Sequence, residues 1–127
     1  MELVVDTNAL SAWLDGDPAI EKPLSFASGL LLSPMALGEY RFGLQASRER
    51  TTYESKLQEL EQRFKVLAVD RATATLYASI RRYLKTNGTP IPWHDVWIAA
   101  QAKQHDVRIL SNDAHFDYVD PDLRVGW

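Results

Sequence analysis

The sequence predicts an α/β fold: a three-layer α/β/α sandwich with a mainly parallel sheet of four to five strands. Short aliphatic runs alternate with longer segments of helical character along the 127 residues. Helices between successive strands make crossover connections, which bring the strands side by side in parallel. No internal repeat, low-complexity segment or linker interrupts this alternation. The chain is therefore expected to form a single domain over residues 1–127.

The composition excludes several classes of protein. The hydrophobic content of 46% and the charged content of 24% are ordinary for a globular domain. The absence of cysteine excludes a disulfide scaffold and a cysteine-bound zinc site, and it fits a reducing cytoplasm. No basic leader or long apolar run is present, so neither secretion nor a membrane span is expected. The net charge of −3 means that contact with nucleic acid would need a local basic patch.

The first strand and helix are predicted around Asp6. Residues 3–5 are a β-branched-rich apolar run, which is typical of a buried strand. Thr and Asn follow at positions 7 and 8 and favour a helix start, and the apolar pattern of residues 9–14 continues as a helix that Gly16 ends. Asp6 is therefore expected where a central strand ends, which is the edge of an α/β sheet at which ligands bind.

Capping and breaking residues locate the other elements. Ser33 before Pro34 is a strong helix start, Asp70 is expected to cap a long helix, and Gly88 to end it. Prolines 90 and 92 make the next segment a rigid loop. The predicted helices cover residues 18–26, 34–46, 49–62, 71–86 and 93–105. The predicted further strands cover residues 30–32, 65–69 and 108–111, with a last short one at 123–125.

Four acids from distant parts of the sequence are candidates for one site. Asp6 and Asp113 both follow strands, so parallel strands would bring them to the same sheet edge. Glu39 has apolar or small neighbours three and four positions away on either side, so it is expected on an inward-packing helix face. Asp95 lies in a first helical turn above an apolar stripe. Taken singly, Asp6, Asp95 and Asp113 can each be read as a helix or turn residue without further function.

Taken together, the four acids favour a divalent metal. Converging carboxylates repel one another and raise each other's pKa values, a penalty that a hard cation removes. Mg²⁺ prefers oxygen ligands and is typically held by carboxylates beside a phosphate group. Mn²⁺ is the alternative ion. Such a centre can activate water for attack on a phosphodiester.

Four segments of the sequence carry a family resemblance. VVDTN, SPMALGEYRFG, IPWHDVWIAAQA and ILSNDAHF, in this order over nearly the whole chain, resemble a PIN-domain ribonuclease of the VapC toxin type. The resemblance implies a metal-dependent endoribonuclease that is the toxin of a toxin–antitoxin pair. It also implies RNA as substrate, a cognate antitoxin and homodimerisation.

The resemblance carries the family's catalytic and metal-binding acids onto Asp6, Glu39, Asp95 and Asp113. A polar residue near the first acid corresponds to Asn8. A hydroxyl residue before the last acid, usually Thr, is Ser111 here. We expect both to orient the carboxylates and the attacking water rather than to bind the metal.

The chain departs from the family pattern beside the third acid. His94 stands where many relatives have Asn, and the bulky Trp93 precedes it. Both are candidates for RNA contact, as are Arg41 and Arg82 among the basic residues of the helices. Most of those basic residues are expected to be solvated helix faces. Trp97 is a further candidate for stacking on a base, although we expect it in the core.

Other functions stay open from the sequence alone. A metal-free ribonuclease would use two histidines as acid and base, but His105 and His115 are expected in surface or capping roles. An aspartyl phosphatase would need Asp in place of Asn8. The main alternative is a catalytically weak or inactive PIN-like protein that acts as a partner-binding module. The sequence does not identify the RNA, the cleavage position, the number of metals or the antitoxin.

Overall fold

A single parallel sheet organises the molecule, whose computed structural model describes all 127 residues. The strand order is β3-β2-β1-β4-β5, and all four neighbouring pairs are parallel. The strands are β1 (Glu2–Val5), β2 (Gly29–Leu32), β3 (Lys65–Val66), β4 (Arg108–Leu110) and β5 (Arg124–Val125). The predicted α/β/α architecture is confirmed.

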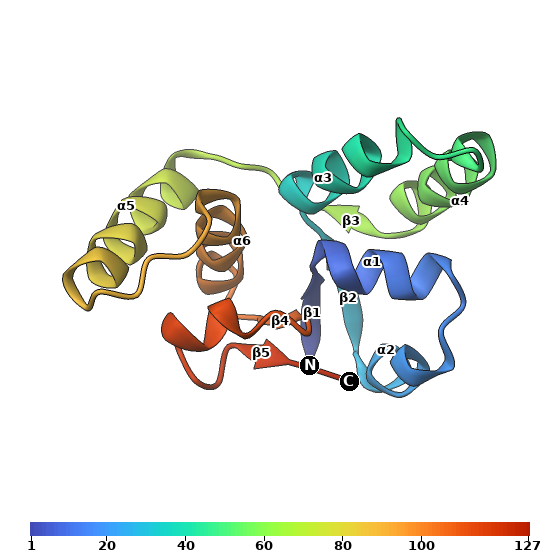
Figure 1. Ribbon diagram of the computed structural model, residues 1–127. Coiled ribbons are helices and arrows are strands. Elements are labelled where there is room, and N and C mark those ends of the chain that lie inside the picture. Colours follow the sequence, from blue (N-terminus) through green and yellow to red (C-terminus); the bar gives the residue numbers. More distant parts are fainter.

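Helices cover both faces of this sheet. In Figure 1, α6 lies against one face with α5 outside it, α1 and α2 lie on the other side, and α3 with α4 stands beyond the upper edge. The α-helices are α1 (Thr7–Leu14), α2 (Glu21–Phe26), α3 (Pro34–Leu44), α4 (Arg50–Arg63), α5 (Arg71–Thr86) and α6 (Trp93–Gln104). Two 3₁₀ helices complete the fold, η1 (Pro18–Ile20) and η2 (Ala114–Tyr118). None of the helices combines the length and apolar character that a membrane span requires.

Strand β1 is the centre of the hydrophobic core. Leu3, Val4 and Val5 are almost completely buried, because helices cover β1 on both faces and β2 and β4 flank it. These side chains belong to one cluster of 27 buried apolar residues. The chain leaves β1 for β2 on one side and reaches β4 on the other. The sheet order therefore reverses at the carboxyl end of β1, which is where open α/β sheets bind ligands.

Capping side chains behave as the sequence predicts. The Ser33 hydroxyl accepts a hydrogen bond from the Met35 N–H at the start of α3. Asp70 and Thr73 form a reciprocal capping box at the start of α5. Gly88 follows that helix with a φ of +69°, a left-handed conformation that glycine adopts without strain.

The predicted strand over residues 65–69 is too long. Only Lys65–Val66 is a strand, and the ladder ends with a hydrogen bond from the Leu67 N–H to the Leu32 carbonyl at 2.8 Å. β3 is an edge strand that pairs only with β2, and β2 ends at Leu32 because Ser33 begins α3. The chain therefore has no strand to pair with beyond this point. No sequence pattern predicted η2, a helix of five residues.

Candidate active site

Asp6 lies buried at the reversal point of the sheet. It follows β1 directly, its N–H donates to the Leu110 carbonyl at 3.1 Å, and only 3% of the residue is exposed. Its Oδ2 accepts hydrogen bonds from the Ser111 hydroxyl at 2.7 Å and from the Asn8 amide at 3.3 Å. Both bonds end on Oδ2, so Oδ1 carries no side-chain hydrogen bond.

Ser111 and Asn8 join the ends of β1 and β4. The Ser111 hydroxyl also accepts from the Asn8 amide at 3.1 Å and from the Asp113 N–H at 2.9 Å. The Asn8 side-chain oxygen accepts from the Asn112 N–H at 3.1 Å. Residues more than a hundred positions apart thus fix one another. Asn8 and Ser111 therefore both hydrogen-bond directly to the Asp6 carboxylate.

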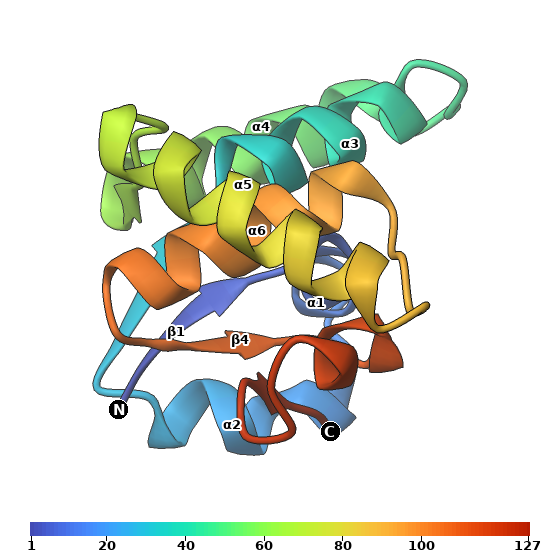
Figure 2. The same cartoon turned by 90° about the vertical axis from the view of Figure 1, so that its left-hand side faces the viewer.

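Asp95 reaches the same place from the first turn of α6. It is 4% exposed, and its repulsion with Asp6 and Asp113 contributes to raising its pKa. Figure 2 shows the start of α6 and the segment of η2 on the same side of the molecule. Asp6, Asp95 and Asp113 are therefore brought together by three elements, although they are distant in sequence.

Glu39 joins the site but not as the sequence predicts. Its side chain is 46% exposed rather than packed inward. The apolar neighbour Phe42 on the same face is itself 80% exposed, so this face of α3 is not a core face. The Glu39 Oε2 accepts a hydrogen bond from the Thr7 hydroxyl at 2.9 Å. Glu39 consequently lines the open side of the carboxylate group.

Two histidines border the carboxylates. His94 Nε2 lies 3.5 Å from Asp95 Oδ1 and 3.6 Å from Glu39 Oε2. His115 Nδ1 lies 3.1 Å from Asp113 Oδ1 and 3.4 Å from Asp95 Oδ2. His115 is exposed, as expected of a surface residue, but its ring also lies against two acids of the site, whereas His105 follows the end of α6 and is exposed without such contacts.

The signal for His115 was its position two residues after Asp113. The sequence did not reveal that η2 begins there and turns the ring back towards the acids. An extended chain would have pointed the same side chain elsewhere. The backbone conformation of η2, rather than the residue type, therefore brings the His115 ring close to the acids.

The electrostatics of the site favour a bound cation. Burial raises the pKa of Asp6, and the hydrogen bond from Ser111 opposes this only in part. Burial, with repulsion by Asp6, raises the pKa of Asp95 to about 6. Desolvated carboxylates in mutual repulsion are stabilised by a divalent ion, and their oxygen atoms are the ligands that Mg²⁺ and Mn²⁺ accept. The donor set of this site therefore fits such an ion.

The predicted RNA-contact residues have different surroundings. The Arg41 guanidinium pairs with Glu54 and Glu61 of α4, so its charge is already neutralised within the fold. Trp93 is 67% exposed at the start of α6, beside the acids. Arg82 is exposed on α5 and makes no ion pair.

Trp97 behaves as expected for a packing residue. Its ring stacks on Tyr77 with centroids 4.0 Å apart, which joins α6 to α5. The ring is held between two helices of one layer. Trp97 is therefore not a candidate for stacking on a base.

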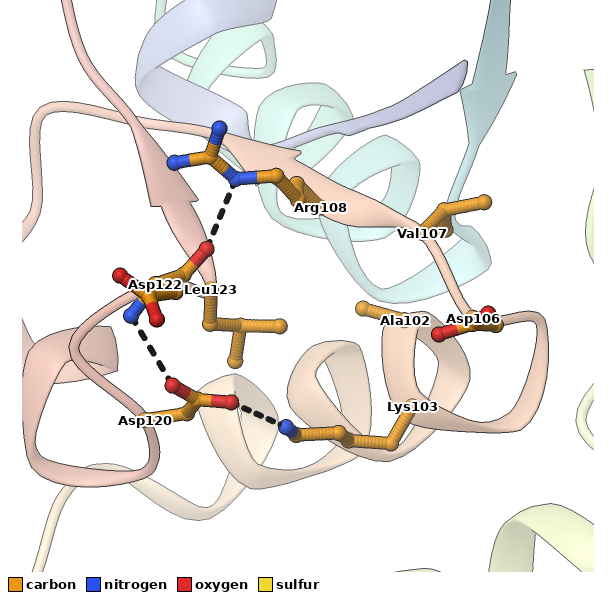
Figure 3. Close-up of a pocket in the computed structure, with 8 residues that line it drawn as sticks. All are labelled: Ala102, Lys103, Asp106, Val107, Arg108, Asp120, Asp122 and Leu123. Atoms are coloured by element: carbon orange, nitrogen blue, oxygen red, sulfur yellow. Dashed lines mark hydrogen bonds and ion pairs between the residues drawn. The ribbon is translucent and has the colours of Figure 1, made fainter. Parts of the chain in front are cut away.

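A second polar pocket lies at the opposite, amino edge of the sheet. It has a volume of about 180 Å³ and lies between α6 and the starts of β4 and β5 (Figure 3). Lys103 pairs with Asp120, which also accepts from the Asp122 N–H at 2.9 Å, and Arg108 donates to the Asp122 carbonyl at 2.7 Å. The Lys103 ammonium thus pairs with one of the three carboxylates that line this pocket, Asp120.

Comparison with known proteins assigns the family. The family model of the PIN domain matches residues 3–121. Toxin FitB of Neisseria gonorrhoeae is 31% identical over 122 residues, which cover 87% of both chains. Ribonuclease VapC4 of Mycobacterium tuberculosis is 36% identical over 101 residues, which cover 74% of this chain and 73% of VapC4.

Solved structures agree with this assignment. FitAB bound to an IR36 DNA fragment matches with a TM-score of 0.82 and 28% identity, over 99% of this chain and 94% of that one. DNA-bound VapBC from Salmonella typhimurium matches with a TM-score of 0.86 and 22% identity, over 100% and 98%, which supports the fold. The chain therefore belongs to the PIN-domain family, among the VapC-type toxins that its sequence resembles.

Proposed function

We propose that the chain is a divalent-metal-dependent endoribonuclease, the toxin of a toxin–antitoxin pair, that hydrolyses RNA phosphodiester bonds. The observation that carries this proposal is the convergence of Asp6, Glu39, Asp95 and Asp113 at the sheet edge where the strand order reverses. The ribonuclease and toxin relatives support the same activity. Either Mg²⁺ or Mn²⁺ can serve as the ion in this proposal.

The four carboxylates would hold the ion directly or through water. When bound, a divalent ion lowers the pKa of water and stabilises the charge that develops on the phosphate. The side chains around it preset the carboxylates. Ser111 and Asn8 hold Asp6 through Oδ2, and Thr7 holds Glu39 through Oε2. This preorganisation lowers the cost of forming the reactive arrangement.

The RNA would approach from the exposed side of the site. Trp93 offers a ring on which a base can stack, and the half-exposed His94 lies beside Glu39 and Asp95. We assign substrate contact to Trp93, His94 and Arg82.

The proposed partners follow from the neighbours. The FitAB and VapBC structures are toxin–antitoxin assemblies bound to DNA. We propose that this chain likewise acts in the cytoplasm as a homodimer bound by a cognate antitoxin.

The deciding experiment is cleavage of a single-stranded RNA by the purified chain. We expect cleavage with Mg²⁺ or Mn²⁺, none with a chelator, and a loss of at least about 10³-fold in Asp6→Asn, which removes charge at nearly constant volume. Asp122→Asn, an exposed acid at the far edge of the sheet, is the matched control and keeps full activity.

Circular dichroism of Asp6→Asn and Asp122→Asn serves to check that both variants are folded. Full cleavage by folded Asp6→Asn, or cleavage that resists chelation, contradicts the proposal. A chain that binds its antitoxin but cleaves no RNA under any metal condition would instead be the inactive, partner-binding form of the fold.

A further inference from the structure

His115 offers a nitrogen atom to a site otherwise built from oxygen. One donor atom from each of Asp95, Asp113 and His115 lies within 4.8 Å of the other two. Two ligands on opposite sides of one ion of this size are about 4.2 Å apart. Shifts of a few tenths of an ångström would therefore allow all three groups to bind the same ion.

The backbone holds the His115 ring in this place. Asp113 caps η2 by accepting from the His115 N–H at 2.9 Å, and its own N–H donates to the Ser111 hydroxyl. Arg124 of β5 donates two hydrogen bonds to Asp117, both at 2.9 Å, and ties η2 to the sheet. The ring is 47% exposed, so it closes the site from the solvent side rather than from the core.

We propose that His115 Nδ1 is a direct ligand of the divalent metal and makes this site select a first-row transition ion such as Mn²⁺ over Mg²⁺. The inference rests on the metal site of the proposed function and adds a ligand to it. Mg²⁺ prefers oxygen ligands, whereas imidazole binds first-row transition ions, with Mn²⁺ the weakest binder among them. A nitrogen ligand in place of water therefore favours the transition ion.

His94 does not compete for this position. Its Nε2 lies near the other oxygen of Asp95, Oδ1, and near Glu39. His115 lies near Asp95 Oδ2. The two imidazoles thus lie near different oxygen atoms of Asp95. Only His115 forms, with Asp95 and Asp113, a group whose donor atoms all lie within 4.8 Å of one another.

Metal binding to the chelator-stripped full chain tests the inference without any measurement of cleavage. Calorimetric titration is expected to give an affinity for Mn²⁺ at least about tenfold above that for Mg²⁺. His115→Ala should remove this preference, which means a loss of about tenfold in Mn²⁺ affinity and a change of less than about threefold in Mg²⁺ affinity. His105→Ala, an exposed histidine after α6, is the matched control and should leave both affinities unchanged.

Pulsed electron paramagnetic resonance gives a direct test of the bond. The Mn²⁺-loaded chain should show coupling to a nitrogen nucleus, and His115→Ala should remove it. The inference is overturned if the nitrogen coupling persists in folded His115→Ala. It is also overturned if His115→Ala and the unmodified chain bind Mn²⁺ with equal affinity.

The two proposals fail in distinguishable ways. If His115→Ala has no effect but Asp6→Asn abolishes binding of both ions, the carboxylate site stands and His115 is no ligand. If the unmodified chain binds neither Mn²⁺ nor Mg²⁺, both proposals are overturned.

Discussion

At the scale of single residues, the Ser111 side chain connects three other residues of the site. Its hydroxyl donates to Asp6 and accepts from Asn8 and from the Asp113 N–H. It is completely buried, so none of these bonds is replaced by water when it is lost. A hydroxyl at this position therefore orients two acids at once.

The raised pKa of Asp95 predicts a pH dependence of stability. Its pKa is about 6 in the folded chain, against an ordinary 3.8, so the folded state binds the proton more tightly than the unfolded state. The resulting stabilisation is complete below about pH 4 and is lost as the pH rises through 6. In chelator, Asp95→Asn should be more stable than the unmodified chain at pH 7.5, by on the order of 3 kcal/mol.

Urea unfolding at pH 5 and pH 7.5 measures this difference. The unmodified chain should lose more stability than Asp95→Asn between the two pH values, whereas Asp122→Asn, at an exposed acid, should follow the unmodified chain. If the free energy of unfolding changes with pH equally in the unmodified chain and in Asp95→Asn, ionisation of Asp95 does not destabilise the folded chain, and the prediction is wrong.

At the scale of secondary-structure elements, α3 and α6 are joined by a buried polar contact. The Ser33 hydroxyl caps α3 and donates to the Gln101 side-chain oxygen at 2.6 Å, and the Gln101 amide donates to the Ala68 carbonyl at 3.4 Å. Ser33 and Gln101 are both fully buried. This contact sets α3, which carries Glu39, against α6, which carries Asp95.

Removing the Ser33 hydroxyl should therefore destabilise the chain. Ser33→Ala removes a helix cap and leaves the Gln101 oxygen buried without its partner, at a combined cost of about 2–3 kcal/mol. Ser25→Ala, whose exposed hydroxyl bonds only to the Lys22 carbonyl, should stay within about 0.5 kcal/mol of the unmodified chain. Denaturant unfolding compares the two, and equal losses would rule out the contact as a joint between α3 and α6.

At the scale of the whole molecule, the charge distribution limits how RNA can bind. The net charge is −3, and four of the acids that contribute to it lie in the site. The phosphates of RNA must therefore be attracted by a few local cations and by the metal. Arg41 is paired with acids of α4. Arg82 lies in the half of α5 that leads through residues 87–92 to the start of α6 and Asp95 (Figure 2).

RNA binding should consequently depend on Arg82. In the Asp6→Asn background, Arg82→Ala is expected to weaken binding of single-stranded RNA at low salt. It should also reduce the slope of log affinity against log salt by about 0.7, the value for one phosphate contact. Fluorescence anisotropy over a salt series measures both. Arg71→Ala, at the opposite end of α5, is the matched control, and identical slopes for the two variants would exclude Arg82 from the RNA surface.

The sequence by itself determined the fold class, the helix starts and the four acids. These features depend on local signals, since apolar runs, capping residues and acids after strands have their effect within a few positions. Asp6 and Asp113 were predicted to meet because parallel strands leave no other arrangement. The sequence predicts β3 too long, because the length of this strand depends on where its partner β2 ends.

Only the tertiary structure decided which polar groups surround those acids. Arg41 is neutralised by ion pairs because α4 brings Glu54 and Glu61 against it. Glu39 is exposed because no element covers the Phe42 side of α3. His115 enters the site because five residues after Asp113 form η2. Each outcome depends on a neighbour that is distant in sequence or on a short turn, neither of which leaves a periodic pattern in the chain.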